Sequence, residues 1–78
     1  MPLYFFDTRD GDMFIRDDGG EELPDLDAAK RAAARLLADL ARDVIPESEK
    51  RVLTVEVRDA GGRQVIEARL TFEAITFS

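Results

Sequence analysis

The chain has 78 residues, enough for one domain with one hydrophobic core, and we expect residues 1–78 to form that single domain. It contains no cysteine, histidine or tryptophan, which excludes disulfides, structural zinc sites, thiolate nucleophiles and imidazole bases. The net charge of −6 leaves no basic footprint for nucleic acid, so we expect no direct nucleic-acid partner. No run of about 20 apolar residues is present, so we expect no membrane span and a cytoplasmic protein.

The first predicted element is a β-hairpin. The runs "LYFFDT" (3–8) and "DMFIRD" (12–17) favour strands, and Asp10-Gly11 between them is a dipeptide preferred in two-residue type I′ turns. A turn centred on that dipeptide fixes the cross-strand register. The expected pairs are Phe6 with Ile15 and Thr8 with Met13 on one face, and Phe5 with Arg16 and Asp7 with Phe14 on the other.

An acidic segment follows the hairpin. Residues 17–27, "DDGGEELPDLD", hold six acids and no base, whereas the rest of the chain has eleven of each. Asp25 and Asp27 suit the start of a helix. The other four acids are not needed for capping, and they either keep a small domain in solution or attract a basic partner surface. These four partner-binding candidates are Asp17, Asp18, Glu21 and Glu22.

A long helix is predicted within "LPDLDAAKRAAARLLADLARDVIPE" (23–47). Pro24 disfavours helix at the preceding residue, Asp25 or Asp27 can cap the first amides, and Pro46 ends the helix. Apolar residues recur at steps of three and four and form one stripe that a sheet must cover. The members of the stripe are Leu26, Ala29, Ala33, Leu36, Leu37, Leu40 and Val44. On the opposite face we expect weak ion pairs. These pairs are Asp27–Arg31, Arg35–Asp39 and Asp39–Arg42.

Two half-buried strands follow. "RVLTVEVRD" (51–59) and "RQVIEARLTFEA" (63–74) alternate apolar and polar residues. Because both apolar rows must face the same side, the connection between the strands must contain an even number of residues, two or four. The predicted fold is therefore α+β: a two-layer ββαββ domain with a four-stranded antiparallel sheet and one long helix on one face. Orders 2-1-3-4 and 1-2-4-3 both keep all neighbouring strands antiparallel.

Apolar residues are expected on both faces of this sheet. The helix-facing set comprises Tyr4, Phe6, Met13, Ile15, Leu53, Val55, Val57, Ile66, Leu70 and Phe72. The opposite set comprises Leu3, Phe5, Phe14, Val52, Val65, Ile75 and Phe77. With a single helix, the second set stays open to water, and a contiguous apolar patch of this kind typically marks an interface. Its four candidate contact residues are Leu3, Phe5, Phe14 and Phe77.

No catalytic, cofactor-binding or metal-binding residue is predicted. The glycines at positions 11 and 19 are not preceded by the ligand pattern of a calcium loop, and no nucleophile motif is present. We therefore predict a protein that is not an enzyme and needs no cofactor. One alternative from another class remains: the carboxylates of the first hairpin, Asp7, Asp10 and Asp12, could bind a hard cation or a small ligand.

Three stretches resemble a known family. "MPLYFFDTRDGD", "DDGGEELPDLDAA" and "VEVRDAGGRQVIEARLTF" are similar in order and spacing to a widespread family of short, uncharacterised bacterial proteins with a domain of unknown function. This resemblance implies a stand-alone cytoplasmic protein and brings no site residues. The hairpin, acidic loop, "LPDL" and alanine-rich helix also resemble, in motif order, the HicB-like antitoxin domains. That resemblance implies dimerisation and neutralisation of a small basic toxin.

The sequence thus favours a small protein-interaction module. It would form a homodimer or bind a small protein partner, a basic one included, through the open sheet face or an edge strand. The alternatives are the ligand- or metal-binding protein and the HicB-like antitoxin.

Overall fold

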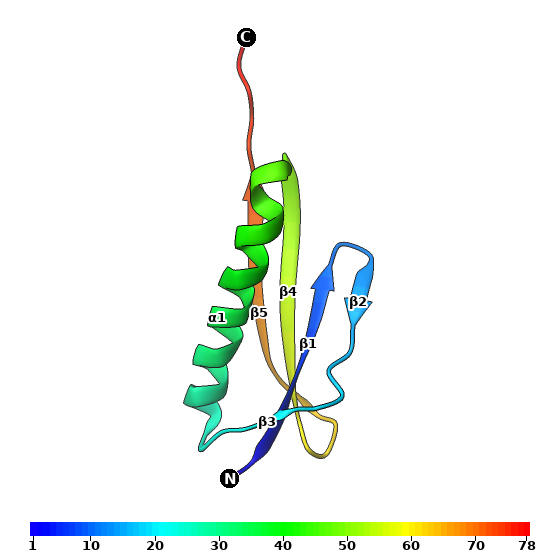
Figure 1. Cartoon of the computed structure of the whole chain (residues 1–78), viewed down its shortest axis with the longest axis vertical. Coiled ribbons are helices and arrows are strands. Elements are labelled where there is room, and N and C mark those ends of the chain that lie inside the picture. The colour runs from blue at the N-terminus through cyan, green and yellow to red at the C-terminus, as the bar shows by residue number, and fades with distance from the viewer.

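The computed structural model describes residues 1–78 and has the predicted α+β architecture. Its elements are β1 (Leu3–Asp10), β2 (Met13–Ile15), β3 (Glu21–Glu22), α1 (Leu26–Val44), the 3₁₀ helix η1 (Ile45–Glu47), β4 (Lys50–Asp59) and β5 (Gln64–Glu73). The antiparallel sheet has the order β2-β1-β4-β5, one of the two predicted orders, and β3 adds a short pairing to β1. The helix lies over β4 and β5 (Figure 1).

The helix begins and ends as its local sequence indicates. The Asp25 carboxylate accepts a hydrogen bond from the Ala28 N–H at 2.8 Å, which caps the first turn. Ala29, Ala33 and Leu37 are buried against the sheet, while Leu26, at the first helical position, stays 49% exposed. Alanines at the contact let the helix approach the sheet closely, so the core is compact. Of the predicted ion pairs on the outer face, only Asp39–Arg42 forms, at 3.3 Å. No helix of the structure combines the length and the apolar character that crossing a membrane requires.

The predicted register of the first hairpin is wrong by two residues. The observed pairs are Thr8 with Ile15, Arg9 with Phe14 and Asp10 with Met13, so the central turn residues are Gly11 and Asp12. Gly11 has φ +58°, and a glycine in the first central position is what a type II′ turn prefers. A shift of two residues leaves every side chain on its predicted face.

Two residues expected in the core are not there. Met13 is 65% and Ile15 60% exposed, although both lie on the helix side of the sheet. The reason is the position of α1, which covers β4 and β5 and leaves β2 outside its width (Figure 1). The core is built instead from Tyr4, Leu53, Val55 and Val57 of the sheet and the buried helix residues.

The alternation of β4 and β5 is confirmed. Leu53 pairs with Leu70, Val55 with Ala68 and Val57 with Ile66, all on the helix side. Four residues, 60–63, lie between the ends of the two strands. The last pair before the turn is Arg58 with Gln64, however, so the pairing encloses five residues, an odd number, and the even-number expectation does not hold there. A bulge after Val57 keeps both apolar rows on the same side.

Candidate interaction surfaces

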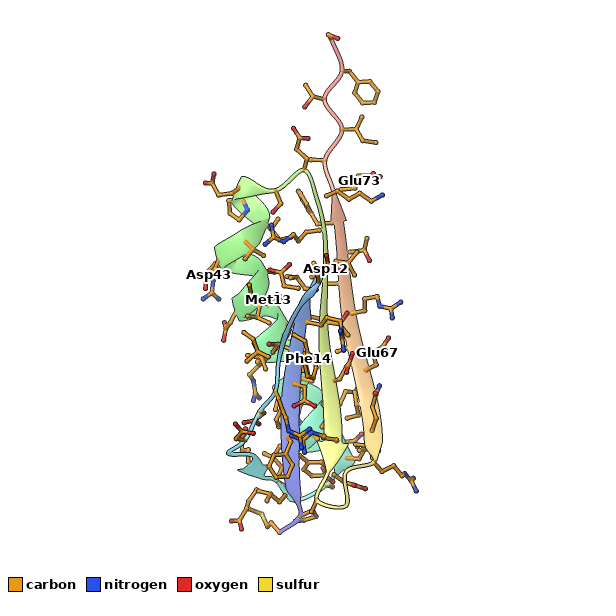
Figure 2. All side chains as sticks on the ribbon, turned by 90° about the vertical axis from the view of Figure 1, so that its right-hand side faces the viewer. Asp12, Met13, Phe14, Asp43, Glu67 and Glu73 are labelled. Carbon is orange, nitrogen blue, oxygen red and sulfur yellow. The ribbon has the colours of Figure 1, made fainter.

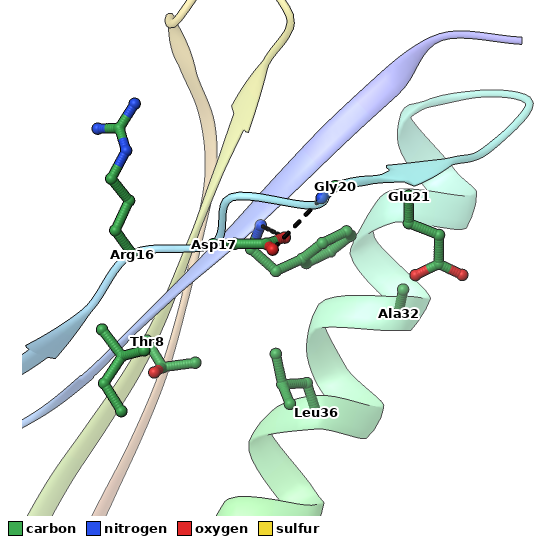
Figure 3. Close-up of a pocket in the computed structure, with 9 residues that line it drawn as sticks. Thr8, Arg16, Asp17, Gly20, Glu21, Ala32 and Leu36 are labelled. Atoms are coloured by element: carbon green, nitrogen blue, oxygen red, sulfur yellow. Dashed lines mark hydrogen bonds between the residues drawn. The ribbon is translucent and has the colours of Figure 1, made fainter.

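Asp17, predicted as a free surface charge, is committed to the fold. Its Oδ2 accepts the Phe6 N–H at 3.0 Å, and its Oδ1 accepts the N–H groups of Gly19 at 3.0 Å and Gly20 at 3.3 Å. Figure 3 shows the bond from Gly20. Along β1, the pairing with β2 stops at Thr8 and the pairing with β3 starts at Tyr4. Phe6 lies in the gap, so the Asp17 carboxylate replaces the missing strand partner.

The surroundings of Asp17 change its acidity. Burial by itself would raise the pKa of this carboxyl group. The N–H groups of Phe6, Gly20 and Gly19 and the charge of Arg58 outweigh that effect and hold the pKa below its ordinary value. The ionised form is therefore the one that the fold stabilises, and it is internally satisfied.

A buried ion pair lies next to Asp17. Arg58 Nε donates to Asp7 Oδ2 at 2.9 Å, and Arg58 Nη2 donates to the Asp17 carbonyl at 2.7 Å. The Asp17 N–H donates to Asp7 Oδ1 at 2.9 Å. Asp7 is only 5% exposed, so this carboxylate depends on these partners. Sequence reasoning missed the pair because 51 residues separate Asp7 from Arg58.

The other three acids of the predicted set stay exposed. Asp18 lies 3.9 Å from Arg16 in a loose contact, and both side chains are mostly exposed. Glu21 and Glu22 form β3 and pair with Tyr4 and Leu3. All three therefore remain available to a partner, beside the outer edge of β1.

The four apolar candidates do not form one patch. Leu3 and Phe5 are neighbours beside Gly20, and the Arg58 guanidinium covers the Phe5 ring at 4.4 Å from its centre. Phe14 is 43% exposed, and the guanidinium carbon of Arg9 lies over the Phe14 ring, 4.6 Å from the ring centre. Phe77 is 88% exposed on the segment that follows β5.

Charged residues occupy the rest of this open sheet face. They project from β1, β4 and β5 on the side away from α1, and Figure 2 shows Glu67 and Glu73 doing so. The set comprises Asp7, Arg9, Lys50, Glu56, Arg58, Glu67, Arg69 and Glu73. The predicted apolar patch is thus divided into small parts between charged side chains.

The free edge of β5 is the longest unpaired backbone in the sheet. β5 has ten residues and is the last strand in the sheet order. The Ala74 N–H donates to the Glu49 carbonyl at 2.7 Å, which continues the register of the β4–β5 pair. Since the direction of backbone groups alternates along an antiparallel strand, the odd-numbered residues point theirs away from β4. These residues are Glu67, Arg69, Thr71 and Glu73.

Two surface grooves flank the helix. A groove of ≈ 450 Å³ lies between α1 and the outer part of the sheet, where Thr8, Ile15 and Leu36 are among its walls (Figure 3). The second groove, of ≈ 500 Å³, lies along β5 near the end of α1. Its lining residues are Ala41, Arg42, Ile45, Pro46, Leu70, Thr71 and Phe72. The second groove therefore adjoins the free backbone edge.

The carboxylates of the first hairpin are held apart. Asp7 binds Arg58, whereas Asp10 receives two hydrogen bonds from Arg51, at 2.7 and 2.8 Å. The bonds from Arg51 lower the pKa of Asp10. No group of three or more carboxylates is close enough together to hold a metal ion.

The fold and these surfaces define a small two-layer α+β domain with one long free sheet edge. Residues 3–71 match the model of the family described as a domain of unknown function (DUF6894), and the chain belongs to this family. No curated protein and no solved structure matches the chain significantly.

Proposed function

We propose that this protein is a non-enzymatic interaction module that binds another polypeptide by strand addition to β5. The observation that carries the proposal is the ten-residue edge, whose outward N–H and C=O groups have no partner. An added strand satisfies those groups and gains side-chain contacts on both faces. The apolar groove beside Leu70 and Phe72 supplies such contacts on the helix side.

The open sheet face is a weaker candidate for docking. Its aromatic residues are covered by arginines, and its charged groups already pair with one another, as Arg9 does with Glu56 at 3.2 Å. A partner on this face would have to displace these contacts and desolvate the charges, which costs free energy. The metal-binding alternative is not favoured either, because Asp7 and Asp10 bind different arginines.

The exposed acids give the proposal an electrostatic component. Asp18, Glu21 and Glu22 carry negative charge at the edge opposite β5, and the whole chain carries −6. Such a field accelerates association with a basic partner, as the HicB-like alternative requires, but does not fix its position. Asp17 takes no part in this, because its oxygens are occupied inside the fold.

Amide hydrogen exchange followed by NMR tests the proposal. We expect the N–H groups of Glu67, Arg69, Thr71 and Glu73 to become protected as the protein concentration rises and light scattering shows association. Thr71→Pro removes one outward N–H and adds a ring at the edge, and this protection should disappear. Thr71→Val keeps the N–H and is the matched control. Outward amides that exchange freely at every concentration, or stay protected in Thr71→Pro, contradict the proposal.

A further inference from the structure

We infer that the strand added to β5 is the β5 of a second copy, paired antiparallel about a two-fold axis at Thr71. This inference rests on the proposed function and specifies its partner. Such an arrangement joins two sheets into one and places both helices on the same face. Charge order and apolar surface along β5 support this register, and the spacing of the helices is compatible with the pairing.

The first feature is the charge order along the edge. The outward-facing residues carry side chains in the order acid, base, neutral, acid: Glu67, Arg69, Thr71, Glu73. An axis at Thr71 sets each Arg69 opposite the partner's Glu73, and this pair occurs twice by symmetry. Opposite charges directly across an antiparallel pair are stabilising, whereas like charges are destabilising.

Neighbouring registers are less favourable. An axis at Arg69 or at Glu73 sets that residue opposite its own copy, and an axis at Leu70 sets Glu67 opposite the partner's Glu73. An axis at Ala68 also sets Glu67 opposite the partner's Arg69. That axis, however, brings the irregular backbone beside the bulge into the pairing. The axis at Thr71 pairs the regular part of β5.

The second feature is the apolar surface around the axis. Leu70, Thr71 and Phe72 line the ≈ 500 Å³ groove, and the register brings the partner's Phe72 opposite Leu70 on the helix side. Burial of these side chains adds a hydrophobic contribution to the pairing.

The third feature is the flank of the helix on the β5 side. Strands are about 4.8 Å apart, so two helices that each lie over a β4–β5 pair would be about 10 Å apart, an ordinary packing distance. Ala41 lines the β5 groove, and Ala34 lies seven residues before it on the same flank. These two alanines leave room on this flank, and the larger residues Arg42, Ile45 and Pro46, which also line the groove, would fill the space between the two helices.

A single cysteine at the axis tests the inference. The chain has no cysteine, so any disulfide formed by Thr71→Cys joins two copies. In the proposed register the two Cα atoms are about 5.5 Å apart, within disulfide range. Glu67→Cys is the matched control, because this residue forms no charge pair across the proposed axis and its Cα lies about 28 Å from its own copy in this register. We expect rapid cross-linking of Thr71→Cys at low micromolar concentration and slow cross-linking of Glu67→Cys.

Charge exchange gives an independent test. Arg69→Glu and Glu73→Arg should each weaken dimerisation roughly 10- to 100-fold, because each puts like charges opposite one another twice. The double variant, with both substitutions, should return to within about threefold of the wild type. Analytical ultracentrifugation measures all four dissociation constants, and circular dichroism verifies the folds.

The outcomes separate the inference from the proposed function. Protected outward amides together with cross-linking of Thr71→Cys and rescue by the double variant support both. Protected outward amides without the cross-link or the rescue overturn the second-copy register and leave strand addition standing. A monomer whose outward amides exchange freely overturns both.

Discussion

The Asp17 carboxylate accepts a hydrogen bond from the Phe6 N–H. In a regular sheet this N–H would donate to the backbone of a neighbouring strand. This role could not be predicted from the acidic run around it, since it depends on where two short strands stop and start. The charge pattern alone places Asp17 with Asp18, yet only Asp18 is free of the fold. Surface charge is therefore an incomplete guide to which acids a partner can reach.

The depressed pKa of Asp17 predicts sensitivity to acid. A carboxyl group whose folded pKa is lower than its unfolded pKa stabilises the fold above the unfolded value, about 3.8, and this stabilisation is lost as pH falls through the folded pKa. Asp17→Asn should lower the free energy of unfolding at pH 7 by about 1–3 kcal/mol, since one amide oxygen cannot satisfy every N–H group. Its stability should also fall less between pH 5 and pH 2.

Urea unfolding at a series of pH values measures this effect. Asp18→Asn is the control, because that side chain is exposed and should leave both the stability and its pH dependence nearly unchanged. An Asp17→Asn variant with the wild-type acid dependence would show that other carboxylates are responsible.

The surroundings of Gly20 indicate that adding a single methyl group there lowers the stability of the domain. It has φ +73°, and an added Cβ would lie 2.9 Å from a ring carbon of Phe5 and 3.1 Å from Leu3. Gly20→Ala should therefore destabilise the domain by about 1–3 kcal/mol. Gly62→Ala has a similar φ of +87° in open space, so thermal unfolding of both variants separates backbone strain from the clash. Equal losses would mean that the Phe5 contact adds nothing.

At the scale of elements, Arg58 connects β4, β1 and the acidic loop. It donates to Asp7 and to the Asp17 carbonyl while its guanidinium lies over Phe5. Lysine keeps the charge but lacks the two guanidinium N–H groups that bind Asp7 and the Asp17 carbonyl at the same time. Arg58→Lys should therefore lower the free energy of unfolding, measured by chemical denaturation, by about 1–3 kcal/mol. Arg9→Lys is the control, because the exposed Arg9–Glu56 pair should contribute less than about 1 kcal/mol. Similar losses in the two variants would contradict a special role for Arg58.

The helix and the two long strands were predictable because their information is local. Asp25 caps as its residue type suggests, and Leu53, Val55 and Val57 alternate as a half-buried strand requires. β3 was not predictable, since two glutamates have no strand pattern and pair only because Asp17 returns the chain to β1. The predicted hairpin register was wrong because Asp10-Gly11 and Gly11-Asp12 are both acceptable central residues of a two-residue turn.

For the whole molecule, the width of one helix decides which predicted core residues are buried. A helix about 10 Å across covers roughly two strands, and α1 covers β4 and β5. Alternation along β2 correctly indicated the helix side for Met13 and Ile15, but it carries no information on how far the helix extends. The four candidates Leu3, Phe5, Phe14 and Phe77 do not form one patch, for a related reason. Charged residues on the neighbouring strands separate them, and the sequence of one strand does not show its neighbours.

Concentration should affect the stability of the whole protein. If association occurs through β5, mass action raises the melting temperature with protein concentration, by about 3–6 °C for each tenfold increase in a domain of this size. Differential scanning fluorimetry or calorimetry over a hundredfold range measures this shift. The Arg69→Glu variant should melt at a temperature that depends much less on concentration. A wild-type melting temperature that does not change would contradict self-association.

The two outer edges of the sheet are unlike, and this difference determines how large an assembly can grow. On the β1 side, pairing is split into three residues of β2, two of β3 and the Asp17 carboxylate between them. An incoming strand finds no continuous template there, whereas β5 offers one. If the proposed strand addition to β5 occurs, growth therefore stops when this single receptive edge is consumed. We then expect a finite particle, and not a fibril, even at high concentration.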